Sequence, residues 1–67
     1  MSELTETASF SVHVRGQKYV VILFRVRKWA RYEVLHRGRK IASGSSTGWD
    51  LEKARQEAIQ HVYRLAG

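Results

Sequence analysis

The 67-residue sequence predicts an α+β domain, in which an antiparallel sheet of three or four strands packs against one C-terminal helix (β-β-β-(β)-α). Apolar and polar residues alternate through the first two thirds of the chain, as in strands with one buried face. Glycine interrupts this alternation at two places, and from Leu51 onward apolar residues recur every three or four positions. We therefore expect a single domain over residues 9–67, preceded by a flexible N-terminal tail of residues 1–8.

The first two strands are predicted as a hairpin. Phe10, Val12 and Val14 alternate with serine and histidine. Gly16-Gln17 then supplies a tight turn, because glycine suits the first central position of a two-residue loop. The second strand covers residues 18–28 and is rich in β-branched and aromatic residues.

Two registers stay open for this hairpin, because the second strand is apolar at both its even and its odd positions. A three-residue loop with a bulge places Val20, Ile22 and Phe24 opposite the apolar residues of the first strand. A two-residue loop places the odd positions Tyr19, Val21 and Leu23 there instead.

A third strand is predicted over residues 32–36, a turn at Gly38-Arg39 and a short fourth strand over residues 41–45. The helix that follows has an apolar stripe and a polar side. The stripe consists of Leu51, Ala54, Ala58, Val62 and Leu65, and the polar side of Glu52, Lys53, Gln56, Glu57, Gln60 and Arg64. Asp50 is a candidate N-cap, Thr47 with Asp50 is an alternative capping box, and Trp49 is expected to pack under the first turn.

The charge is concentrated in the predicted sheet. The chain has 12 Lys and Arg residues against six Asp and Glu, a net charge of +6. Within residues 9–48 the only acidic residue is Glu33, and most of the basic residues are arginine. These basic residues are Arg15, Lys18, Arg25, Arg27, Lys28, Arg31, Arg37, Arg39 and Lys40.

The residue inventory does not favour catalysis. There is no cysteine, the acidic residues do not converge, and His13, His36 and His61 lack the spacing of metal ligands. The longest apolar run, residues 19–24, is far shorter than the roughly 20 residues that span a bilayer, and the first eight residues do not resemble a signal peptide. We expect no enzymatic activity, no cofactor, no metal, no membrane partner and a cytoplasmic location.

Arginine-rich strands with a neighbouring tryptophan favour nucleic acid as the partner, since guanidinium groups bind phosphates and guanine edges. Two alternatives stay open. The positive charge could recognise an acidic protein, or it could serve solubility and protect the sheet edges.

From Arg25 onward the chain resembles DNA-binding domains built from a three-stranded sheet and a helix. The stretch from Val26 to Val34 is similar to the plant ethylene-response-factor type, as is the chain end, residues 60–67. Residues 57–60 resemble the helix of the arm-site-binding N-terminal domain of phage tyrosine recombinases. In both families the sheet enters the major groove, and the resemblance implies that double-stranded DNA is contacted by Arg25, Arg27, Trp29 and Arg31.

A weaker similarity links the hairpin and helix to the C-terminal half of double-stranded-RNA-binding domains, so duplex RNA is a further candidate. A competing class follows from the sheet's second face. We expect an uncovered apolar patch of Tyr19, Val21, Leu23 and Leu35, which would join two copies in a homodimer or receive a protein partner. The chain would then be a small interaction module of a phage or plasmid type.

Overall fold

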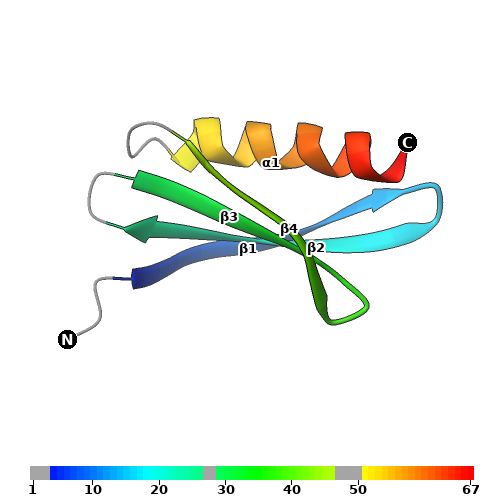
Figure 1. Ribbon diagram of the computed structural model, residues 1–67, viewed down its shortest axis with the longest axis horizontal. Helices are drawn as coiled ribbons and strands as arrows, with labels where there is room; N and C mark the ends of the chain where they lie inside the picture. Colours follow the sequence, from blue (N-terminus) through cyan, green and yellow to red (C-terminus); the bar gives the residue numbers. More distant parts are fainter. Residues whose placement is uncertain (1–3, 27–28, 47–50) are drawn as a thin grey trace.

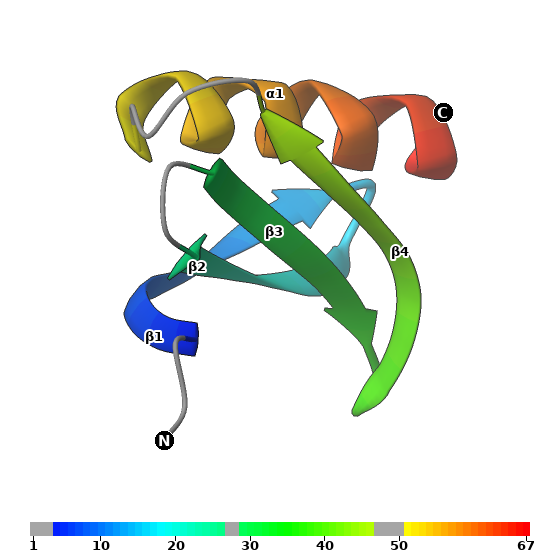
Figure 2. The same cartoon turned by 60° about the vertical axis from the view of Figure 1, so that its left-hand side comes forward.

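The computed structural model describes residues 4–26, 29–46 and 51–67, which form four strands followed by one helix (Figure 1). The elements are β1 (Leu4–Val14), β2 (Gln17–Val26), β3 (Trp29–His36), β4 (Arg39–Ser46) and α1 (Leu51–Ala66). The strands make one antiparallel sheet in the order β1-β2-β3-β4. The helix lies across one face of this sheet (Figure 2), which confirms the predicted fold class with the fourth strand present.

All four strands start earlier than predicted, β1 and β3 by three residues or more. β1 begins at Leu4, which pairs with Val26, so residues 4–8 extend the strand instead of belonging to a tail. A bulge between Glu6 and Ala8 adjusts the register there and lets the pairing continue. β3 begins at Trp29 instead of Tyr32.

Both hairpin turns are centred one residue earlier than predicted. Arg15 (φ 53°) and Gly16 (φ 77°) occupy the first turn, and Arg37 (φ 56°) and Gly38 (φ 76°) the second. Positive φ at both central residues is the signature of a type I′ turn. Turns at residues 16–17 and 38–39 would instead have placed Arg15 opposite Lys18 and Arg37 opposite Lys40, and like charges directly opposite each other destabilise a sheet.

The register decides which face of β2 is buried. Phe10 pairs with Val21, and Val12 pairs with Tyr19. The odd positions of β2 therefore face the apolar residues of β1, as the two-residue-loop alternative predicted. Each odd position lies opposite a β1 residue two places earlier in the chain than that alternative gave. Tyr19, Val21 and Leu23 lie in the core beneath the helix, together with Val34 of β3. The prediction that Tyr19, Val21 and Leu23 form an uncovered patch is therefore wrong. Leu35, the fourth member of that set, lies on the opposite face, because it alternates with Val34 along β3.

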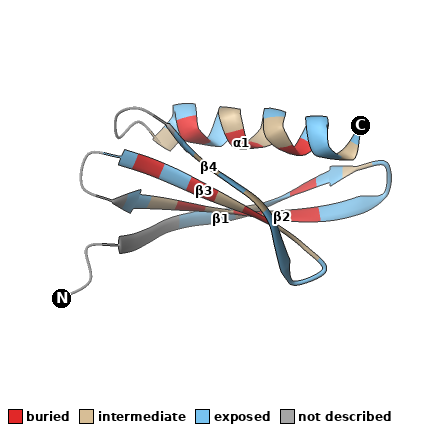
Figure 3. Ribbon diagram, in the orientation of Figure 1, coloured by how far each residue is buried: buried red, intermediate tan, exposed pale blue. Residues whose placement is uncertain are grey.

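The helix packs through small residues. Ala54, Ala58 and Val62 are fully buried against the sheet, as the stripe predicted (Figure 3). Leu65, placed in the same stripe by its spacing, is 47% exposed, because the helix ends at Ala66 near the margin of the sheet. The predicted capping residues Thr47 and Asp50, and Trp49 beside them, lie outside the described residues.

Candidate nucleic-acid interface

Five cations lie in or next to the two hairpin turns. In an antiparallel sheet in sequential order, the β1–β2 and β3–β4 turns occupy the same end of the sheet (Figure 1). The cations at this end are Arg15, Lys18, Arg37, Arg39 and Lys40, here called the turn-end cations, and all five residues are exposed. Glu33 is the acidic side chain near them, and its Oε2 lies 3.7 Å from Nζ of Lys40.

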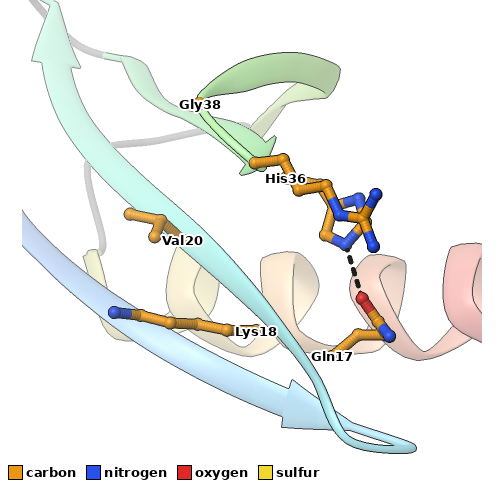
Figure 4. Close-up of a pocket in the computed structure, with 6 residues that line it drawn as sticks. Gln17, Lys18, Val20, His36 and Gly38 are labelled. Atoms are coloured by element: carbon orange, nitrogen blue, oxygen red, sulfur yellow. Dashed lines mark hydrogen bonds between the residues drawn. The ribbon is translucent and has the colours of Figure 1, made fainter.

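Two shallow hollows flank the second turn. One has a volume of about 320 Å³ and lies between the start of β2 and the end of β3, where it is lined by Gln17, Lys18, Val20, His36, Arg37 and Gly38 (Figure 4). The other has a volume of about 330 Å³ and is lined by His36, Arg37, Arg39 and Ile41. His36 and Arg37 therefore border both hollows, and each hollow has room for an anionic group beside a guanidinium.

His36 is held in place between these hollows. Its ring stacks on Tyr19 of the neighbouring strand, with centroids 4.7 Å apart and planes inclined by 21°. Its Nε2–H donates a hydrogen bond to Oε1 of Gln17 at 3.1 Å. Figure 4 shows the His36 ring and the Gln17 amide directed toward each other, while Lys18 extends the other way. This contact ties the two hairpins together beside the turn-end cations.

The face of the sheet opposite the helix, here called the open face, has an apolar stripe along β2. Val20, Ile22 and Phe24 alternate with the buried core residues, and each is half-buried although no described element covers this face. On β3, Leu35 pairs with Val20, and Arg31 pairs with Phe24. Trp29 shares this face, because it lies two residues before Arg31, and it is 52% exposed. Exposed serines border the stripe on both outer strands, namely Ser9, Ser11, Ser43 and Ser45.

The structure separates the four contacts that the resemblance implied. Trp29 and Arg31 lie on the open face. Arg25 pairs with Ala30, which is buried beneath the helix. The Arg25 side chain is therefore attached on the helix-facing side of the sheet. It lies on the other face of the sheet from Trp29 and Arg31. Arg27, with its neighbour Lys28, lies outside the described residues.

A polar cluster joins the helix to β3. The Tyr32 hydroxyl forms a hydrogen bond with Nδ1 of His61 at 2.7 Å, and the two rings meet edge to face. Burial raises the pKa of Tyr32 above its ordinary value of 10.0, the charge of Glu57 raises it further, and Arg64 opposes this rise. Glu57, predicted on the polar side of the helix, turns one carboxylate oxygen into the protein, where it has no hydrogen-bond partner.

The hydrogen bond between Tyr32 and His61, with the Tyr32 ring packed over Gly44, holds the helix against the sheet and is here called the clasp. Tyr32 reaches across β4 above Gly44, and a Cβ at Gly44 would lie only 2.7 Å from Cε2 of the Tyr32 ring. Glycine is therefore required there by close approach of a side chain. Within residues 4–26, 29–46 and 51–67, no group of three or more histidine or carboxylate side chains is arranged to hold a metal ion.

The sequence analysis identified the turn-end cations and Trp29 as candidate contacts. It did not predict that Val20, Ile22 and Phe24 lie on the face of the sheet that the helix leaves open. The hairpin register decides which face of the second strand is open, and the sequence left two registers possible.

Comparison of the chain with family models, curated proteins and solved structures gives no match in any of the three. Over the described residues, no helix combines the length and the apolar character needed to cross a membrane.

Proposed function

We propose that this protein binds nucleic acid, with the turn-end cations and the adjoining open face as its contact surface, in a binding role without catalysis. The observation that carries the proposal is the repeated arginine in the two hairpin turns. Arg15 and Arg37 both adopt positive φ, at the position where type I′ turns favour Asn, Asp or Gly.

A left-handed conformation of a non-glycine residue destabilises the folded state by about 1 kcal/mol or more. Two turns at the same end of the sheet share this unfavourable arrangement. Backbone strain of this kind concentrates at functional sites, where the side chain is needed in a particular place. A guanidinium group presents a planar fork of donors that matches the oxygens of a phosphate.

The local charge supports a polyanionic partner. Each turn-end cation that contacts a phosphate releases condensed counterions, so the affinity falls as salt rises. Lys40 is the turn-end cation that also meets a carboxylate, at 3.7 Å from Glu33. An acidic protein would offer scattered carboxylates, whereas nucleic acid offers regularly spaced phosphates to all five positions.

The experiment is a fluorescence-anisotropy titration with labelled oligonucleotides at several salt concentrations. We expect micromolar or tighter binding with a steep salt dependence. The double variant Arg15→Asn with Arg37→Asn should bind more weakly, with a salt slope smaller by about 1.4 to 1.8 for two lost phosphate contacts. A control that removes the same charge from the helix, Lys53→Gln with Arg64→Gln, should keep the wild-type slope.

Equal slopes in the two double variants would exclude the turns as the phosphate-binding site. Absence of binding to DNA and RNA alike at 50 mM salt would reject the proposal as a whole. The preference for duplex DNA, which the family resemblance implied, is examined by including a duplex of the same sequence.

A second candidate function rests on the apolar stripe. Val20, Ile22, Phe24 and Leu35 form a contiguous half-buried surface, which a second copy or another protein would cover favourably at about 25 cal/mol per Å² of apolar area. Sedimentation of the wild type and of Ile22→Lys tests this. A dimer that the substitution converts to a folded monomer would establish the homodimer, whereas a monomeric wild type would exclude it.

A further inference from the structure

We infer that the nucleic acid this protein takes is single-stranded, with unpaired bases stacked on Trp29 and Phe24 of the open face. The inference rests on the proposed function and deepens it. The aromatic and apolar residues of the open face support the choice of a single strand, whereas the turn-end cations support nucleic-acid binding as such.

Aromatic and cationic side chains lie next to one another on neighbouring strands of the open face. Phe24 of β2 pairs with Arg31 of β3, and Trp29 lies on the same face two residues from Arg31. These three side chains are therefore grouped on one face at one end of the sheet. Aromatic rings and guanidinium planes are the surfaces on which unpaired bases stack.

The apolar centre of the open face suits a single strand better than a duplex. A duplex presents base edges in its grooves, and their donors and acceptors require polar partners. Val20, Ile22 and Leu35 provide none, so base edges pressed against them would lose their hydrogen bonds to water. A single strand instead presents the flat faces of its bases, for which an apolar surface is suitable.

Cations lie at both ends of the apolar stripe. Lys18 and Lys40 lie at the turn end of the open face, and Arg31 lies near the opposite end. Phe24 lies six positions after Lys18 along β2, about 20 Å at the rise of an extended strand. The phosphates of a short single strand would therefore find cations at both ends of the stripe.

The same charges argue against a second copy as the occupant. Two open faces brought together would place Lys18, Arg31 and Lys40 of one copy near the same residues of the other. Two described acidic residues share this face with the three cations, namely Glu33, which lies 3.7 Å from Lys40, and Glu6, which pairs with Phe24. A polyanion complements this face better than another copy does.

The test compares a 12-nucleotide DNA strand, the RNA of the same sequence and the corresponding DNA duplex by fluorescence anisotropy. We expect the single strands to bind at least tenfold more tightly than the duplex. Trp29→Ala should weaken single-strand binding by about tenfold or more, and Trp29→Phe should restore most of the affinity. Whether DNA or RNA binds more tightly identifies the sugar that is preferred.

The control is Tyr63→Ala, which removes an aromatic side chain of similar exposure, 55%, from the helix. It should leave single-strand affinity unchanged. In a Trp49→Phe background, the fluorescence of Trp29 alone should be quenched when a single strand binds and much less when the duplex is added.

Equal or tighter duplex binding, or equal affinities of Trp29→Ala and Tyr63→Ala, would overturn the single-strand inference and leave nucleic-acid binding intact. A dimer that Ile22→Lys dissociates would also overturn it, because a second copy would then occupy the face. Absence of binding to all three oligonucleotides would reject the proposed function together with the inference.

Discussion

Replacing Gly44 with alanine tests the clasp between the sheet and the helix. The new Cβ would lie 2.5 Å from Cζ and 2.7 Å from Cε2 of Tyr32, far inside van der Waals contact. The Tyr32 ring must then move, and its hydroxyl is bonded to His61 of the helix at 2.7 Å. Overpacking of this kind destabilises by about 1–3 kcal/mol, and the lost hydrogen bond adds about 1 kcal/mol.

We therefore expect Gly44→Ala to lower the free energy of unfolding by about 2–4 kcal/mol, measured by urea denaturation. A domain of this size has a total stability of about 3–10 kcal/mol, so the loss should be obvious. In a Tyr32→Val background the ring is absent, and Gly44→Ala should instead stabilise by about 0.5–1 kcal/mol, because glycine is unfavourable within a strand.

The control is Ser43→Ala, an exposed neighbour on the same strand, which should change stability by less than about 0.5 kcal/mol. Unfolding of Gly44→Ala at the wild-type urea concentration, or an equal effect with and without the Tyr32 ring, would refute a steric role for Gly44.

Three further predictions concern the turns, the buried tyrosine and the register. Arg15→Asn with Arg37→Asn should raise the free energy of unfolding by about 1–2 kcal/mol in urea denaturation, because asparagine tolerates positive φ; unchanged or lowered stability would contradict strained turns. The neutral form of Tyr32 is favoured in the folded state because its pKa is raised, so its stabilisation is complete below pH 10 and is lost as pH rises further. Tyr32→Phe should unfold about 1–2 kcal/mol more easily at pH 7 and show a shallower loss of stability above pH 10, and parallel pH profiles would exclude this role. Leu23→Lys should unfold the protein by circular dichroism, since Leu23 is 3% exposed beneath the helix, whereas Ile22→Lys should remain folded; the reverse result would mean that the register is wrong.

The helix and the sheet class could be predicted from the sequence because their periodicities are unambiguous. Ala54, Ala58 and Val62 recur at helical spacing, and all three are buried. Leu65 fits the same spacing but lies one residue before the helix end. Periodicity therefore identified the face, but it could not show where the sheet beneath it stops.

The faces of β2 could not be assigned from the sequence. Ile22 and Leu23 are both apolar, so the pattern within the strand contains no preference, and the decision comes from the turn and from pairing with β1. Rules for glycine alone favoured turns that begin at Gly16 and Gly38. The pairing across the strands overrides them, but this one-residue shift of the turn leaves Tyr19, Val21 and Leu23 on the face of Phe10 and Val12. The candidate dimer face was assigned to the wrong side because the choice between the two hairpin registers was open.

The sequence identified the residues of the candidate interface, but it did not predict on which face of the sheet each one lies. Arg25 and Arg31 both belong to the basic segment, yet strand alternation and the β2–β3 register place them on opposite faces. Spatial grouping of the two turns at one end of the sheet required the strand order, which the sequence did not specify.

The measurement that tests the account most directly is an NMR titration of the ¹⁵N-labelled protein with a single-stranded oligonucleotide. The account predicts that the largest shift changes fall on the Trp29 indole, on backbone amides around Phe24 and Arg31, and on the two turns containing Arg15 and Arg37. Outward positions of the helix should stay unchanged. Changes concentrated on the helix, or no changes at saturating oligonucleotide, would contradict the central claim.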